Sequence, residues 1–140
     1  MLLQLFVGGG ACICNVAIHA LVMTMVVRVA RTVDANSVLP ASLFLMAIMI
    51  ATVSVLMVAH VLEVAVWATT YAIVGAAPAG SSMIYFAFVN YTTLGYGDVV
   101  PVDQWRLLGP ATAMCGVLMF GWSTAVIFEV LRKALARHGE

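Results

Sequence analysis

The longest apolar stretch of this chain, residues 41–74, contains a single carboxylate, Glu63, and neither lysine nor arginine. As an α-helix it would be about 50 Å long, which exceeds the hydrocarbon core of a bilayer, about 30 Å thick. Two further apolar stretches, Leu2–Val27 and Arg106–Leu131, are also long enough to cross that core. With 64% hydrophobic and 9% charged residues, a soluble domain of this size would lack polar surface. We therefore expect an all-α integral membrane protein with three transmembrane helices.

A shorter apolar segment lies between the second and third of these stretches. Ser81 and Ser82 offer an N-cap for a helix over Met83–Tyr91. About ten residues are too few to cross a bilayer, so this helix is expected to be re-entrant. Non-helical backbone that follows it is tolerated at membrane depth only where protein buries it or water lines it. This order of elements predicts a pore loop.

The segment after the short helix carries the string Thr92-Thr93-Leu94-Gly95-Tyr96-Gly97-Asp98. Glycine tolerates positive φ without steric cost, so alternating glycines allow successive carbonyl oxygens to turn toward the same side. Four copies around an axis would then stack rings of oxygens that replace the water shell of a cation. The string closely resembles the selectivity-filter signature of potassium channels, in which valine or leucine stands at the Leu94 position.

From Ala41 onward the chain resembles the two-span pore module of the potassium channel superfamily, in the style of small prokaryotic channels. The resemblance implies a homotetramer whose only bound cofactor is K⁺. The ion-binding residues that it implies are Thr93, Leu94, Gly95, Tyr96 and Gly97. The segments that it implies are an additional N-terminal transmembrane helix (1–31), a cytoplasmic loop (32–40), a pore module (41–131) and a short cytoplasmic tail (132–140). Within the pore module they are an outer helix (41–74), a pore helix (82–92), the filter (93–98) and an inner helix (105–131).

The same resemblance assigns roles to residues around the filter. Tyr85 matches a position where the family often has an aromatic donor to the aspartate after the filter, which here is Asp98. Val89 stands where some of these channels carry a glutamate behind the filter, so filter stability must depend on other partners. Gly116 falls where such channels have a hinge glycine, and Gly121 follows in the same helix. A role for both glycines in close helix packing is an equal alternative.

The positive charges indicate an orientation. Arg28 and Arg31 follow the first span, and Arg132, Lys133 and Arg137 follow the last. Because cytoplasmic flanks carry an excess of lysine and arginine, we expect an outside N-terminus and a cytoplasmic C-terminus. The resemblance to small prokaryotic channels implies a prokaryotic plasma membrane. The first span lacks the positive n-region of a cleaved signal peptide. Basic residues at helix ends and a net charge of zero do not indicate a nucleic-acid surface.

Glu63 is unusual because a carboxylate within a membrane span is costly unless it is paired or hydrated. His60, Glu63 and Trp67 share one helical face, in the outer half of the span. We expect Glu63 to support the surroundings of the filter; the alternative is a carboxylate hydrated near the outer headgroups. Its candidate partners are His60, Asn90, Tyr91 and Arg106. A metal site at His60 and Glu63 would need further ligands, and the sequence indicates none nearby.

Other polar residues have simpler interpretations. Asn15 and His19 in the first span are expected to pack or to hydrogen-bond between helices. A pH-sensing role for His19 or His60 is an alternative. Asp98 and Asp103 would place negative charge at the outer mouth of the pore, or would be solvated loop carboxylates.

The three cysteines, Cys12, Cys14 and Cys115, all lie in apolar segments. Their odd count argues against a disulfide framework, and we expect buried free thiols, which behave as small apolar side chains. Glu129 is expected to pair with the basic residues that follow it or to line the inner entrance. No nucleophile–base or metal constellation indicates an enzyme.

These observations predict a channel that passes K⁺ selectively and passively across the membrane. The alternatives are a weakly selective monovalent cation channel and a non-conducting membrane subunit that retains the pore fold. The chain lacks a helix with regularly spaced arginines, so a voltage sensor is not expected. The expected partners are K⁺, the lipid bilayer and further copies of the chain, with no small-molecule substrate indicated.

Overall fold

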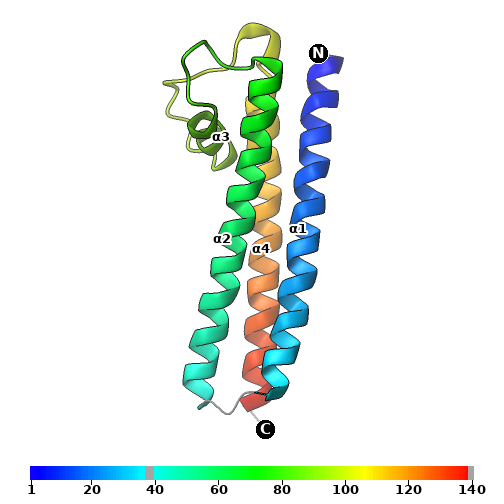
Figure 1. Ribbon diagram of the computed structural model, residues 1–140, viewed down its shortest axis with the longest axis vertical. Coiled ribbons are helices and arrows are strands. Elements are labelled where there is room, and N and C mark those ends of the chain that lie inside the picture. Colours follow the sequence, from blue (N-terminus) through cyan, green and yellow to red (C-terminus); the bar gives the residue numbers. More distant parts are fainter. Residues whose placement is uncertain (37–39, 139–140) are drawn as a thin grey trace.

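A computed structural model describes residues 1–36 and 40–138, and every regular element in that part of the chain is helical. The elements are α1 (Leu2–Asn36), α2 (Ala41–Val74), α3 (Met83–Tyr91), the 3₁₀ turn η1 (Asp103–Trp105) and α4 (Leu108–His138). Figure 1 shows α1, α2 and α4 side by side along the molecule, with the two termini at opposite ends. The short helix α3 lies beside the upper part of α2. The all-α architecture with three long helices agrees with the expectation from the sequence.

Three helix boundaries differ from the expected ones. Helix α1 continues to Asn36, although a loop was expected from residue 32. Helix α4 begins at Leu108, after the turn η1, although the inner helix was expected from residue 105, and it runs to His138, although a tail was expected from residue 132. Near the end of α4, Glu129 pairs with two basic residues one turn later, which favours the helix by a few tenths of a kcal/mol for each pair. Its carboxylate lies 2.9 Å from Arg132 Nη2 and 2.8 Å from Lys133 Nζ. Residues 37–39 of the expected loop and 139–140 of the expected tail lie outside the described residues.

The three consecutive glycines of α1 do not interrupt it. Mid-helix glycine costs about 1 kcal/mol relative to alanine, and Gly8, Gly9 and Gly10 would on that ground loosen the start of the helix. The helix nevertheless runs through all three. A Cβ atom on Gly8 would lie only 3.3 Å from the Cβ atom of Ala111 in α4. Tertiary packing of α1 against α4 therefore outweighs the low helix propensity of this segment.

One face of α1 packs against the rest of the molecule. Its buried residues recur at intervals of three or four positions, which is the spacing of a single helical face. They are Ala11, Asn15, His19, Met23 and Val26. This face contacts both α2 and α4. Two polar residues, Asn15 and His19, are thus placed in the interior with no exposed surface.

The core between α2, α3 and α4 is aromatic. Trp67 and Tyr71 of α2 are fully buried with ring centroids 6.0 Å apart, and the ring of Phe86 in α3 lies 4.8 Å from that of Tyr71. Such separations are typical of favourable aromatic contacts. Tyr71 also receives a hydrogen bond from Asn90 Nδ2 (3.3 Å) and shares one with Thr112 Oγ1. These contacts attach α3 to both long helices that flank it.

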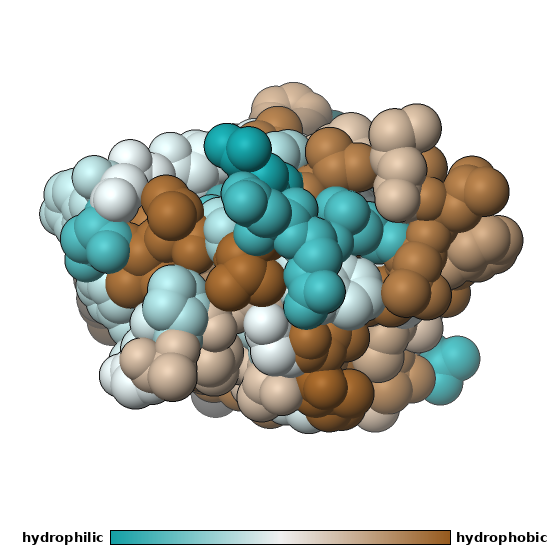
Figure 2. Space-filling model, turned by 90° about the horizontal axis from the view of Figure 1, so that it is seen from above, coloured by the Kyte–Doolittle hydropathy of each residue, from teal (hydrophilic) through white to brown (hydrophobic). Residues whose placement is uncertain are grey.

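Much of the outer surface is apolar, as a membrane protein requires. Three helical segments are long and apolar enough to cross a membrane: Leu2–Arg28, Ser42–Val74 and Asp103–Ala136. Large side chains on their outer faces are exposed, among them Ile13 and Phe128. Figure 2 views the upper end of the molecule and shows hydrophilic residues gathered across its middle, with hydrophobic residues along much of the rim. This distribution places lipid around the helices and water at the end.

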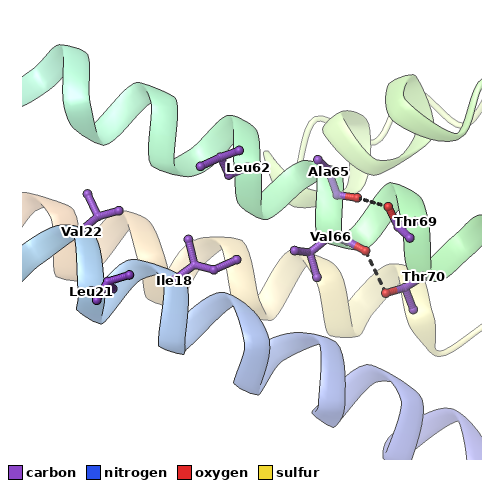
Figure 3. A pocket seen from close by; sticks show the side chains of 8 residues that line it. All are labelled: Ile18, Leu21, Val22, Leu62, Ala65, Val66, Thr69 and Thr70. Carbon is purple, nitrogen blue, oxygen red and sulfur yellow. Dashed lines mark hydrogen bonds between the residues drawn. The ribbon is translucent and has the colours of Figure 1, made fainter.

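A groove of about 580 Å³ runs along the surface between α1 and α2 (Figure 3). It is lined by Ile18, Leu21, Val22, Leu62, Ala65, Val66, Thr69 and Thr70. The hydroxyls of Thr69 and Thr70 donate to the carbonyl oxygens of Ala65 and Val66, each over 2.8 Å. Because these hydroxyl protons are already used within the helix, the groove offers a ligand an almost wholly apolar lining. The polar chemistry of the molecule lies elsewhere.

Candidate functional site

The short helix α3 has defined limits at both ends. Helix α2 stops at Gly75, whose φ of 64° is left-handed and whose N–H binds the carbonyl oxygen of Tyr71. After the turn that follows, Ser82 caps α3 by accepting a hydrogen bond from the Tyr85 N–H over 3.4 Å. Helix α3 has only nine residues and ends at Tyr91. It therefore leads into residues 93–98 beside the upper part of α2 (Figure 1).

Residues 93–98 have an alternating backbone. Positive φ angles occur at Thr93 (60°), Gly95 (56°) and Gly97 (79°), with Leu94 and Tyr96 between them outside that region. Two of the three positions are glycines, which adopt this conformation without a Cβ penalty. Thr93 is β-branched, and positive φ is rare for such a residue. The alternation that was expected from the glycines therefore begins two residues before Gly95, at a threonine.

Hydrogen bonds within the chain hold this segment near its start and at its end. The carbonyl oxygen of Val89 accepts hydrogen bonds from the N–H groups of Leu94 (3.0 Å) and Gly95 (3.3 Å). At the far end, the hydroxyl of Tyr85 donates to Asp98 Oδ2 over 2.6 Å. This is the pair that the resemblance implied, and the bond raises the pKa of Tyr85. Val89, which has no carboxylate to offer, thus contributes its main-chain oxygen.

One face of the segment 93–98 is not covered by other residues in the described part of the same chain. All residues from Thr92 to Asp98 are exposed, including 53% of Leu94 and 70% of Tyr96. Non-helical backbone at membrane depth requires cover by protein or contact with a water-filled space. The exposed face of residues 93–98 is therefore a surface that needs either a partner or water.

Glu63 lies in a buried polar cluster just behind the end of α3. Its carboxylate, with no exposed surface, accepts a hydrogen bond from the Tyr91 hydroxyl and lies 3.0 Å from His60 Nδ1. Two of the four candidate partners are thus in contact with it. Asn90 instead binds the hydroxyl of Tyr71, and Arg106 lies 3.6 Å from Asp103. The alternative of a hydrated carboxylate near the headgroups is wrong, because the side chain is fully buried.

The sequence did not predict two contacts of this cluster, although the expectation that His19 hydrogen-bonds between helices is confirmed. His19 of α1 places its Nδ1 atom 2.7 Å from Glu63 Oε1, and Ser123 of α4 places its Oγ atom 3.0 Å from His60 Nε2. The expectation that no further metal ligand lies near His60 and Glu63 is therefore wrong, because His19 supplies one. The available signal was the spacing of Asn15 and His19, which puts two polar residues on one face of an apolar helix.

The remaining predicted site residues lie outside this polar cluster. Trp67 is fully buried in the aromatic core, where its Nε1 atom has no partner among the described residues. Gly116 packs against the main chain of Tyr91, whereas a Cβ atom on Gly121 would have open space within 4 Å. Asp103 is exposed, and its carboxylate lies 3.6 Å from Arg106.

The three cysteines are all free thiols. Cys115 is buried, Cys12 is half-buried and Cys14 is exposed. Asn15 Nδ2 lies 3.8 Å from Cys115 Sγ, which is a further contact between α1 and α4. The expectation of free thiols agrees with the structure, but Cys14 was wrongly expected to be buried, since it lies on the outer face of α1.

Comparison with known proteins completes the description of the site. A family model described as "Ion channel" matches residues 59–133, more than half of the chain. The matched region contains the second half of α2, all of α3, the segment 93–98 and most of α4. No curated protein and no solved structure gives a significant match. The chain therefore belongs to the ion channel family, and the match supports the resemblance of this region to the pore module of the potassium channel superfamily.

Proposed function

We propose that this protein is a potassium-selective channel in which four copies surround one pore. K⁺ binds to the carbonyl oxygens of Thr93, Leu94, Gly95 and Tyr96 and to the Thr93 hydroxyl. The observation that carries this proposal is the alternation of left-handed φ at residues 93, 95 and 97. In an extended segment, such alternation turns consecutive carbonyl oxygens toward one side, and a row of oxygens on one side can replace the water shell of a cation.

The strain at Thr93 supports the same assignment. A β-branched residue with φ of 60° is conformationally unfavourable, and strain of this kind persists where surrounding contacts impose it, often at functional sites. The contacts that impose this conformation are the hydrogen bonds from the N–H groups of Leu94 and Gly95 to the carbonyl oxygen of Val89. We infer that they hold the Thr93 carbonyl and hydroxyl at the inner end of the filter.

Four copies are required because one chain offers one oxygen at each level. A single carbonyl cannot replace the hydration shell of an ion, whereas a ring of four at successive levels can. The exposure of Leu94 and Tyr96 is consistent with burial of the segment in an oligomer. Gly97 and Asp98 close the segment, and Asp98 with Asp103 brings negative charge to the outer mouth.

Helix α3 acts in this proposal as the re-entrant pore helix. Its C-terminal end, at Tyr91, carries the partial negative charge of the helix dipole and would face the central cavity, where it stabilises a cation. The inner helix α4 lines that cavity. Gly121, with open space around it, is the candidate gating hinge, whereas Gly116 serves packing.

The orientation proposed from the basic residues fits the fold. The termini lie at opposite ends of the molecule (Figure 1), as three crossings require. With the C-terminal end of α4 in the cytoplasm, the N-terminus and the loop after residue 98 lie outside. We retain the prokaryotic plasma membrane as the proposed location.

Ion flux measured in liposomes that contain only this protein tests the proposal. We expect K⁺ flux, a reversal potential set by K⁺ in mixed K⁺ and Na⁺ solutions, and a tetrameric mass in detergent. Equal permeability to Na⁺ would favour the weakly selective cation channel, and tetramers without flux would favour the non-conducting subunit. A monomeric protein would overturn the proposal.

Two matched glycine variants locate the filter. Gly97 and Gly80 have similar φ angles, 79° and 85°, and both have open space where a Cβ atom would stand. Gly97→Ala and Gly80→Ala therefore impose similar backbone strain, about 1–2 kcal/mol. We expect Gly97→Ala to abolish K⁺ selectivity and Gly80→Ala to conserve it. Equal effects of the two substitutions would contradict the placement of the filter at residues 93–98.

A further inference from the structure

His19, His60 and Glu63 form a compact group of donor atoms inside the molecule, apart from the exposed segment 93–98. Their donor atoms lie within 4.8 Å of one another. The side chains of His19 and Glu63 have no exposed surface, and that of His60 is 13% exposed. We propose that these three residues bind a divalent transition-metal ion, Zn²⁺ in particular, which fastens α1 to α2. The proposal does not depend on K⁺ conduction.

The distances between the donor atoms suit a metal of this size. Zn²⁺ binds histidine nitrogen and carboxylate oxygen at about 2.0–2.2 Å, so two ligands of one ion lie about 3–4 Å apart. His19 Nδ1 and His60 Nδ1 lie 2.7 Å and 3.0 Å from the two oxygens of Glu63. All three ligand atoms lie within 4.8 Å of one another, so small adjustments of the side chains would bring them to a common centre at these bond lengths. Two histidines and one glutamate form a known zinc ligand set.

The hydrogen-bond partner of the second ring nitrogen, Nε2, of each histidine supports the metal site. A metal-binding histidine almost always donates its second N–H to an acceptor that fixes the ring and its tautomer. Here the Nε2 atoms of both histidines contact the same hydroxyl. Ser123 Oγ lies 3.0 Å from His60 Nε2 and 3.3 Å from His19 Nε2. A hydroxyl oxygen has two lone pairs, so it can accept both N–H groups while both Nδ1 atoms face the metal.

Without a metal, two neutral histidines cannot both donate to Glu63 and keep a partner at every ring nitrogen. If both Nδ1–H groups donate to Glu63, both Nε2 atoms become acceptors. Ser123 has a single hydroxyl proton, so one of the two Nε2 atoms would lack a donor. A buried acceptor without a partner costs about 1–3 kcal/mol. A metal ion removes this conflict. The alternatives without a metal that also remove it are one protonated histidine, or a neutral His60 whose Nδ1 accepts from Tyr91 and whose Nε2–H donates to Ser123.

Tyr91 lies beside the three proposed ligands. Its hydroxyl lies 3.1 Å from His60 Nδ1 and donates to Glu63 Oε2. A water molecule would complete a four-coordinate site, as in zinc sites with three protein ligands, and the Tyr91 hydroxyl would orient the Glu63 carboxylate as a hydrogen-bond donor. Since Tyr91 ends α3, the metal would join α1 and α2 directly and would reach the base of the segment 93–98 through Tyr91.

Metal content of the purified oligomer tests the proposal. The protein is loaded with ZnCl₂ or CoCl₂, desalted and measured by mass spectrometry of the metal, and Co²⁺ also reports tetrahedral geometry through its visible d–d bands. We expect one ion per chain in the parent protein and d–d bands without the sulfur charge-transfer absorption of thiolate ligands. An absence of bound metal, or thiolate absorption from the cysteines, would overturn the site.

Variants separate this cluster from adventitious binding. We expect His19→Gln and Glu63→Gln to lose the bound ion, and Ser123→Ala, which keeps every ligand, to weaken its affinity about 10–100-fold. His138→Gln, which changes the third histidine of the chain, should bind as the parent does. If a variant fails to fold, chelation of the parent decides: EDTA should lower its thermal stability. The alternatives without a metal would be favoured if Ser123→Ala left the metal affinity unchanged. They would also be favoured if EDTA left the thermal stability unchanged.

Discussion

Gly116 in α4 packs directly against the main chain of Tyr91, because a Cβ atom added to this glycine would stand 2.0 Å from the Tyr91 carbonyl oxygen. No flexible side chain can relieve that contact, since both partners are backbone. The close approach lets α4 support the end of α3 immediately before the segment 93–98. Of the two interpretations that the sequence allowed, the structure favours packing at Gly116 over a hinge.

Gly116→Ala should therefore destabilise the protein. Helix propensity alone predicts a gain of about 1 kcal/mol for glycine to alanine in a helix interior. The collision with Tyr91 reverses this sign, and overpacking of a core typically costs about 1–3 kcal/mol. Thermal unfolding in detergent measures the change. Gly121→Ala is the matched control, because its Cβ atom meets nothing within 4 Å, and it should be neutral or stabilising. A Gly116→Ala protein as stable as Gly121→Ala would contradict the contact.

Removal of the charge on Glu63 should weaken the whole bundle, even without metal. With EDTA present, Glu63→Gln replaces a buried acceptor of bonds from two histidines and Tyr91. We expect a loss of about 2–4 kcal/mol, typical of breaking a buried charged network, and faster inactivation of K⁺ flux. Glu129→Gln, which changes an exposed carboxylate, is the control and should leave both properties nearly unchanged. Equal behaviour of the two variants would show that Glu63 does not support α3.

Loss of the Tyr85–Asp98 hydrogen bond at alkaline pH should lower K⁺ flux. The bond raises the pKa of Tyr85 above its ordinary value of 10.0. A group whose pKa is raised on folding contributes its stability below the ordinary pKa and loses it as pH rises through the raised value. Flux should therefore be constant up to pH 10.0 and fall above it. Tyr85→Phe should lower flux at all pH values and remove this transition; persistence of the transition in Tyr85→Phe would assign it to another group.

The N-cap of α3 should contribute measurably to stability. Ser82 Oγ accepts the N–H of Tyr85, and loss of such a cap costs about 1 kcal/mol. Ser82→Ala should lower the midpoint of thermal unfolding, whereas Ser81→Ala, which removes the neighbouring hydroxyl, should change stability by less than about 0.5 kcal/mol. If Ser81→Ala proves the more damaging substitution, the cap has been placed on the wrong serine.

The sequence by itself determined the presence of the helices and the positive φ at Gly95 and Gly97, because both depend on local chemistry, whereas the positive φ at Thr93 was not expected. Apolar stretches too long for a soluble core must be helical in lipid, since no water is present to satisfy free backbone groups. Ser82 and Gly75 mark helix ends through their own hydrogen bonding and conformational freedom. Alternating glycines likewise permit positive φ whatever surrounds them.

Only the tertiary structure decided which polar residues of different helices meet. His19 lies about 26 Å along α1 from its start, and Glu63 lies about 17 Å before the end of α2, so counting residues does not make the two level. Tilt and sliding of packed helices set that register, and these depend on side-chain packing over the whole interface. For the same reason Gly116 could be recognised as a packing glycine only once α4 and Tyr91 were seen together.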